Sequence, residues 1–163
     1  MIFRQWKQVL DGTKTQTRRP VKASQESNRW DIETDVINEV IQWLDNGKQY
    51  PANMRSIYVV GHTYAVQPGR GKKSKGRIHV QKIRRERLGD ISDRDCLAEG
   101  VGYMPQHSVT DSFIPFSVCP ICHRLFPSPQ LAFACLWDCC GGRWEQDQNN
   151  DVWVLEVESG SGL

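Results

Sequence analysis

The spacing of the cysteines is the strongest constraint on how this chain folds. Four of its six cysteines form two pairs with the pattern Cys-x2-Cys-x12-Cys-x3-Cys, namely Cys119, Cys122, Cys135 and Cys139. This matches zinc-finger spacing with cysteine in place of both histidines. On a helix the second pair lies at i and i+4, on one face, which suits tetrahedral closure around a metal. We therefore expect a structural zinc ion, with Cys140 as an alternative to Cys139 and His123 as a further candidate ligand.

The rest of the composition sets the context for these thiols. No apolar run approaches the roughly 20 residues that a membrane helix needs, and the first residues lack the long apolar stretch of a signal peptide. We expect a cytoplasmic protein that does not enter a membrane. In that reducing compartment cysteines are thiols or metal ligands rather than a disulfide framework. A site closed by four cysteines is structural and not catalytic.

Charge is divided unevenly along the chain. Residues 1–90 hold 18 Lys/Arg and 9 Asp/Glu, a net charge of +9, whereas residues 91–163 hold 3 and 10, a net charge of −7. The two halves add to the overall +2. This division predicts a basic face for an anionic partner. Pairing between the two halves on folding is the alternative explanation.

Hydrophobic periodicity predicts an α+β fold. Strands are expected at 57–60, 64–66, 152–157 and 77–87, the last with a bulge near Lys82. Helices are expected at about 3–10, 34–46 and 129–140 and after the N-cap Ser92, with a loop at 21–31 and irregular chain at 103–130. These elements favour a small, mostly antiparallel sheet curled into a barrel. We expect one domain over 1–163, with a cysteine-rich insertion at 103–140 and a flexible tail at 159–163.

Several segments resemble ASCH-domain proteins. Residues 10–19, LDGTKTQTRR, resemble the family's opening signature, a short helix ending in Gly and then Lys-Thr, one residue, Thr and Arg. Segments 60–66, 86–92, 97–100, 136–137 and 152–157 follow in the family's order, with His62 where Asp is usual. The resemblance covers roughly residues 1–20, 57–101 and 130–158. It is closest to the versions carried by bacteriophages and prophages.

The resemblance implies a PUA-like β-barrel related to RNA-binding modules. Members of the family are described as nucleic-acid binders, and one bacterial branch removes the acetyl group from 4-acetylcytidine. The catalytic Lys, Thr and Glu of that branch fall on Lys14, Thr17 and Glu99. The resemblance therefore makes an amidohydrolase one candidate function.

The chemistry of this trio depends on local geometry. Lys14 and Thr17 would face opposite sides of a regular strand, so they converge only if the chain turns or bulges at residues 15–16. Lys14 could then activate the Thr17 hydroxyl or a water molecule, while Glu99 orients Lys14 or moves a proton. Backbone N–H groups or Arg18 could stabilise the developing oxyanion.

A second interpretation, which the sequence favours, is binding without catalysis. Lys14 then contacts phosphate, Thr17 is a strand residue, and Glu99 pairs with Arg18 or Arg19. The expected partner is RNA, DNA or a modified nucleotide in a basic cleft. The candidate contacts are Lys14, Arg18, Arg19, Arg70, Lys72, Lys73, Lys75 and Arg77. A third class is a phage-encoded interaction module that captures a host protein.

Overall fold

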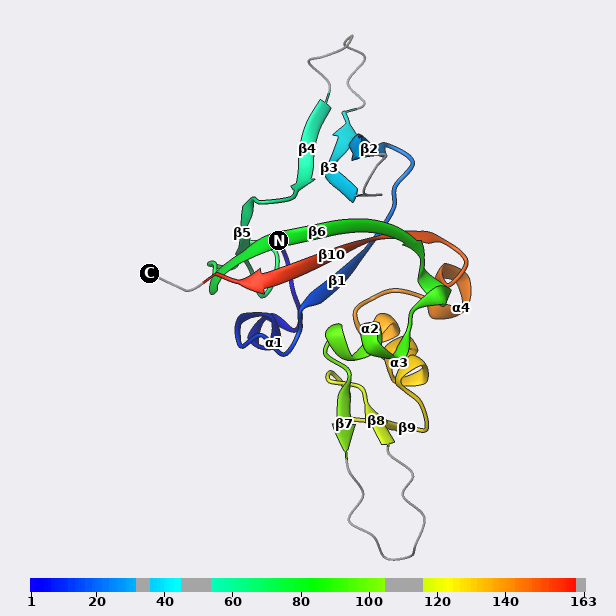
Figure 1. The fold of residues 1–163 in the computed structure, drawn as a ribbon. Coiled ribbons are helices and arrows are strands. Elements are labelled where there is room, and N and C mark those ends of the chain that lie inside the picture. The colour runs from blue at the N-terminus through cyan, green and yellow to red at the C-terminus, as the bar shows by residue number, and fades with distance from the viewer. Residues whose placement is uncertain (32–35, 45–53, 105–115, 161–163) are drawn as a thin grey trace, which may run out of the picture.

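Two antiparallel sheets and several short helices make up the described part of the chain (Figure 1). The computed structural model describes residues 1–31, 36–44, 54–104 and 116–160. In chain order the elements are α1 Trp6–Leu10, β1 Gln16–Pro20, β2 Gln25–Asp31, β3 Val36–Trp43, β4 Met54–Val59, β5 Thr63–Val66, β6 Gly76–Arg87, the 3-10 helix η1 Leu88–Asp90, α2 Asp93–Ala98, β7 Gly102–Met104, β8 Phe116–Val118, β9 Leu125–Phe126, α3 Pro129–Cys139, α4 Trp144–Asp147 and β10 Asp151–Ser159.

The larger sheet is built around two long strands, β6 and β10. Its strand order is β1-β10-β6-β3-β2, with β4 paired to β3 and β5 paired to β6. The smaller sheet has the order β7-β8-β9 and lies beside α2 and α3 (Figure 1). The predicted α+β class and mostly antiparallel pairing are confirmed. Neither sheet closes into a barrel within the described residues.

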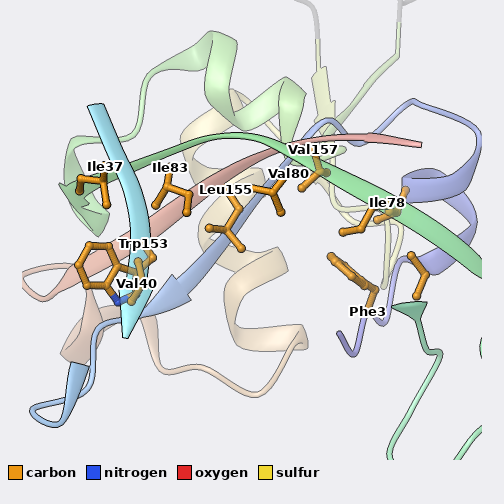
Figure 2. Packing of buried hydrophobic residues seen from close by; sticks show 11 residues of the cluster. Phe3, Ile37, Val40, Ile78, Val80, Ile83, Trp153, Leu155 and Val157 are labelled. Atoms are coloured by element: carbon orange, nitrogen blue, oxygen red, sulfur yellow. The ribbon is translucent and has the colours of Figure 1, made fainter. Parts of the chain in front are cut away.

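Strand β10 is buried on both faces. Trp153 and Leu155 point into one hydrophobic cluster (Figure 2), whereas Val152 and Val154 point into a second cluster formed with α2 and α3. Successive side chains of a strand alternate between faces, so a strand covered on both sides needs apolar residues throughout. This explains the unbroken apolar run at 152–155 and makes β10 the wall between two cores.

The predicted helix at 34–46 is wrong where the structure describes it. Residues 36–43 form strand β3, while 32–35 and 45–46 lie outside the described residues. The register between β3 and β4 shifts between Val40 and Ile41, and both side chains are buried. With Ile37 also buried, the apolar spacing becomes i, i+3, i+4, which is the spacing of a helix. The β-bulge therefore gives the apolar residues of this strand the spacing of a helix.

The predicted loop at 21–31 is also wrong, because residues 25–31 form β2. Among the described strands it pairs only with β3, and it ends the order of the sheet. It hydrogen-bonds to β3 along one edge, and polar side chains such as Glu26 and Ser27 remain accessible. An edge strand of this kind needs no apolar alternation, so its sequence carries no strand signal. The region 103–130, expected to be irregular, contains short strands in its described parts.

Other predicted elements are confirmed. Ser92 caps α2 by accepting a hydrogen bond from the backbone N–H of Asp95, as its position at the helix start implied. The irregularity expected near Lys82 is present, because β10 shifts register between Glu156 and Val157 opposite this part of β6. Among the described helices none is long and apolar enough to cross a membrane.

We predict that the two-sided burial of β10 makes it a sensitive point for stability. Leu155→Ala removes a fully buried side chain and is expected to lower the free energy of unfolding by about 2–5 kcal/mol. Leu125→Ala, the same change at a site that is 53% exposed, should lower it by less than about 0.5 kcal/mol. Urea unfolding followed by circular dichroism measures both. Equal destabilisation by the two changes would contradict this account.

Candidate functional site

A cavity of about 200 Å³ lies along the outer side of β1. Its walls come from residues 2–5, from β1, from the end of α2 and from α3. Lys14, Thr17 and Glu99 all line it, so the structure places the three candidate catalytic residues in one cavity. Phe133 and Trp137 supply aromatic surface on the α3 side.

Lys14 and Thr17 both line the cavity, and Lys14 lies before the start of β1. Helix α1 ends at Leu10, and Gly12 then adopts a φ of +82°, a conformation that glycine enters without steric cost. The backbone N–H of Lys14 donates to Gln8 O at 2.8 Å, and β1 starts only at residue 16. Alternation of faces along a strand therefore does not apply between residues 14 and 17. The turn lies at residues 11–13, before Lys14, and not at residues 15–16, where the sequence predicts a turn or bulge.

Glu99 meets Lys14 at the end of α2. Glu99 is the C-cap residue, and Gly100 follows with a φ of +90°, so the chain reverses immediately after the carboxylate. Lys14 Nζ donates to Glu99 Oε2 and, at 2.9 Å, to the Glu99 backbone oxygen. Lys14 is 5% exposed and Glu99 is 3% exposed. Two of the three ammonium protons are thus held by Glu99 inside the protein.

The hydroxyl of Thr17 has no protein partner in the described part of the chain. Thr17 is 5% exposed and lines the cavity, yet no hydrogen bond joins its side chain to any described residue. Buried polar groups are nearly always hydrogen-bonded, so each exception calls for an explanation. Here the hydroxyl is available to a molecule that enters the cavity.

Arg18 is fully engaged by protein acceptors. Its Nε and Nη2 donate to Glu86 Oε1 at 2.9 and 2.5 Å. Nη2 also donates to Asp95 Oδ2 at 3.2 Å, and Nη1 donates to Glu99 Oε1 at 3.0 Å and to Gln16 Oε1 at 3.4 Å. A guanidinium has five N–H donors, and all five have acceptors here. As placed, Arg18 has no donor left for a phosphate or an oxyanion.

Arg84 extends this ion network away from the cavity. Its Nη2 donates to Asp95 Oδ2 at 2.8 Å, and its Nη1 pairs with Glu86. Glu156, 3.9 Å from Arg84 Nε, lies at the exposed end. Three cations and three carboxylates form the inner part of the network: Lys14, Arg18, Arg84, Glu86, Asp95 and Glu99. Their charges cancel, so this inner network has no net attraction for an anion.

The other predicted phosphate contacts divide by location. Arg19 is half-buried and lines the cavity. Five exposed cations lie on the β5–β6 loop and the start of β6: Arg70, Lys72, Lys73, Lys75 and Arg77. Lys75 Nζ lies 5.8 Å from the Trp6 ring centroid, and Lys7 Nζ lies 5.7 Å from it. We call the five exposed residues the basic loop.

Arg4 and Cys140 also line the cavity, although no sequence pattern had selected them for it. Arg4 Nη1 donates to the backbone oxygen of Cys139 at 2.7 Å, which joins the start of the chain to the end of α3. This hydrogen bond spans 135 residues of sequence. No local motif signals an interaction of that kind.

The four predicted metal ligands form a cluster. Cys119 follows β8, and Cys122 lies in the tight turn between β8 and β9. In this turn the backbone N–H of His123 donates to Cys119 O at 2.9 Å. Cys135 and Cys139 lie one turn apart on α3. All four Sγ atoms lie within 4.8 Å of one another, so the cluster can bind a metal ion.

The cluster contains Cys139 rather than Cys140, and His123 does not belong to it. The backbone N–H of Arg124 lowers the pKa of Cys122 to about 7, whereas burial raises the pKa of Cys139 to about 11. Crowded thiols cannot all ionise without a cation between them. A bound divalent metal would offset the repulsion between neighbouring thiolates, because metal ligation requires the thiolate form of each cysteine.

Comparisons with known proteins add no relative: no family model, curated protein or solved structure matches this chain.

We predict a pH-dependent contribution of Asp95 to stability. Burial raises the pKa of Asp95, but the Arg84 and Arg18 guanidinium groups outweigh it, so the pKa is below the ordinary value of 3.8. A carboxyl with a lowered folded-state pKa stabilises the protein above its unfolded pKa, and this contribution disappears as the pH falls through the folded pKa. Asp95→Asn should therefore destabilise the protein at pH 7, and the difference from the wild type should shrink as the pH falls below about 4.

Thermal unfolding between pH 7 and pH 3 measures this difference. Asp93→Asn, in the same first helical turn but exposed, controls for removal of a carboxylate near the helix start. A destabilisation by Asp95→Asn that stays constant over this range would contradict the assignment.

Proposed function

We propose that this protein is an amide hydrolase that removes an acyl group from a nucleobase, with Lys14, Thr17 and Glu99 as its catalytic residues. One observation carries the proposal: a buried Lys14–Glu99 pair and a Thr17 hydroxyl without a partner among the described residues line the same cavity. The ASCH resemblance of residues 10–19 supplies the substrate class, acetylated cytidine. It also supplies the relation to PUA-like proteins, which here is part of the proposal.

The residues can carry a balanced reaction. Lys14 transfers a proton to Glu99, which gives a neutral amine and a carboxylic acid. The Thr17 oxygen attacks the amide carbonyl carbon as its proton passes to Lys14. The carbon–nitrogen bond then breaks, and Glu99 returns its proton to the departing nitrogen. Water cleaves the acyl-threonine ester, and the products are the free nucleobase amine and a carboxylic acid.

The walls of the cavity suit a flat ring. Trp137 is half-buried and lines the cavity, and aromatic stacking is a common way for proteins to hold an unpaired base. Phe133 also lines the cavity, but the Arg18 guanidinium lies 5.7 Å from its ring centroid. The cavity volume of about 200 Å³ suits a small ligand such as one heterocycle with a small substituent. The third ammonium proton of Lys14 remains available to an oxygen of that ligand.

We predict that Thr17→Val separates catalysis from stability. The change removes the hydroxyl but keeps the side-chain shape, and the hydroxyl makes no hydrogen bond to the described residues. Turnover of 4-acetylcytidine, measured as release of acetate and cytidine, should fall at least about 100-fold. The midpoint of thermal unfolding should stay near the wild-type value or rise. Lys14→Ala and Glu99→Gln should also abolish turnover.

Thr15→Val is the matched control, because Thr15 is exposed and does not line the cavity. It should turn over 4-acetylcytidine like the wild type. Undiminished activity of Thr17→Val would remove Thr17 as the nucleophile. No release of acetate from 4-acetylcytidine or related acylated nucleosides by the wild type would overturn the hydrolase proposal.

Binding of nucleic acid by the basic loop is a second candidate function. None of its five cations pairs with a carboxylate among the described residues, and Trp6 beside Lys75 offers an aromatic surface. Such groups bind backbone phosphates with little dependence on sequence. In contrast, Lys14 and Arg18 are buried and held by carboxylates, so the geometry favours the loop over them for this role.

We predict that replacing Lys72, Lys73 and Lys75 with Gln lowers the salt dependence of single-stranded RNA binding. The slope of log K against log salt concentration should become less negative by about 0.7 for each phosphate that the variant no longer binds. Lys22→Gln is the control, because Lys22 is an exposed lysine at the opposite end of the sheet. Fluorescence anisotropy at several salt concentrations measures the slope, and an unchanged slope in the triple variant would exclude the loop.

We further propose that the cysteine cluster binds zinc. Four cysteines whose Sγ atoms lie within 4.8 Å of one another match the ligand set of a structural zinc site. Zinc would fix α3, which carries two of the cysteines and also Phe133 and Trp137 of the cavity wall. The metal would thus support the cavity without contacting the substrate.

We predict about one equivalent of zinc in freshly purified, reduced protein. Cys139→Ser should release most of this metal, whereas Cys140→Ser, the adjacent thiol outside the cluster, should keep it. Elemental analysis after gel filtration measures the content. Less than about half an equivalent in the wild type, or equal zinc contents in the two variants, would contradict the zinc site.

A further inference from the structure

The cations that line the cavity fall into two groups with different electrostatic surroundings. Lys14 and Arg18 are at least 95% buried and pair with Glu99 and other carboxylates. Arg4 is exposed and Arg19 is half-buried, and neither pairs with a carboxylate among the described residues. The floor of the cavity is therefore neutralised, whereas its mouth carries two positive charges that no described carboxylate compensates.

The hydrogen-bond donors show the same division. All five N–H groups of Arg18 have acceptors. Arg4 uses one donor, on Cys139 O at 2.7 Å, and Arg19 uses one, on Ile2 O at 2.8 Å. Each of these two arginines therefore keeps four N–H groups without an acceptor in the described part of the chain.

The two guanidinium groups are also held in place. The Arg19 guanidinium carbon lies 5.0 Å from the Phe3 ring centroid, while Arg4 is anchored to the end of α3. Phe3 is part of the buried core (Figure 2), so the platform under Arg19 is fixed by packing. Preorganised guanidinium groups with free paired donors match the oxygens of a phosphate.

We propose that Arg4 and Arg19 form a phosphate subsite at the mouth of the cavity. This inference rests on the proposed function and specifies its substrate: the acylated base is attached to a phosphorylated nucleoside rather than to a free nucleoside. The base enters the neutral floor beside Thr17, and its phosphate remains at the charged mouth. The phosphate is either the monoester of a free nucleotide or a diester within RNA.

The test compares three ligands that share cytidine and carry no phosphate, a phosphate monoester or phosphate diesters. Calorimetry measures the dissociation constants of cytidine, cytidine 5′-monophosphate and an RNA trinucleotide with a central cytidine and no terminal phosphate. We expect at least one phosphorylated ligand to bind about tenfold or more tightly than cytidine, since hydrogen bonds to charged groups are among the stronger ones. Preference for the monophosphate identifies a nucleotide substrate, and preference for the trinucleotide identifies RNA.

Arg4→Gln and Arg19→Gln should each remove most of this gain while leaving the affinity for cytidine within about twofold. Arg55→Gln is the matched control, because Arg55 is an exposed arginine on β4 that donates to an amide oxygen, that of Gln42. Metal content and circular dichroism of Arg4→Gln show whether α3 stays in place without its hydrogen bond to Cys139.

The outcomes separate this inference from the proposed function. Equal affinities for cytidine and both phosphorylated ligands, or a phosphate preference that both arginine variants retain, would overturn the subsite while leaving nucleoside hydrolysis intact. If no cytidine ligand binds, inorganic phosphate is the remaining probe. Shifts of the Arg4 and Arg19 Nε–H resonances on its addition would support the subsite and count against the nucleobase substrate. Unmoved resonances would overturn the subsite as well.

Discussion

The buried charge of Arg18 is the constraint on which the site depends. A guanidinium removed from water is tolerated only when its donors and its charge are compensated, and here Glu86, Asp95 and Glu99 do so. These carboxylates come from β6, from α2 and from the C-cap of α2. The ion pairs of Arg18 on β1 with Asp95 and Glu99 therefore hold α2 against the sheet. The same geometry leaves the second oxygen of Glu99 for Lys14.

Strand β10, which lies between the two hydrophobic cores, supports this ion network. Strand β10 turns Trp153 and Leu155 toward one core and Val154 toward the other, and β1 lies beside it at the edge of the sheet. Residues of β1 and of α3 both line the cavity. The cysteine cluster lies on the same helix, so the thiols, the aromatic walls and the ion pairs are concentrated in a small part of the molecule.

Local sequence signals predict the parts of the structure that depend on local physics. The Ser92 cap, the i and i+4 cysteines of α3 and the apolar run of β10 are confirmed because neighbouring residues determine them. Strand β3 has the apolar spacing of a helix because of a bulge between Val40 and Ile41, so periodicity alone assigns it wrongly. The place of Arg4 in the cavity and the full engagement of Arg18 follow from interactions between segments remote in sequence, which no local pattern reveals. The family resemblance groups Lys14, Thr17 and Glu99, but only the packing of α2 and β1 explains why all three line one cavity.

The position of β10 between β1 and β6 has a consequence for how the protein forms during synthesis. In the sheet, β10 lies between β1 and β6, although it is the last of the described strands to leave the ribosome. Until then β1 has no strand partner in the described chain, and both cores lack their common wall. Long-range strand pairing is slow, and β1 cannot pair with β10 until β10 has been synthesised. Until then the segment that carries Lys14 and Thr17 is not fixed in the sheet. The cavity is thus a late product of folding, so a chain truncated before β10 would lack its framework altogether.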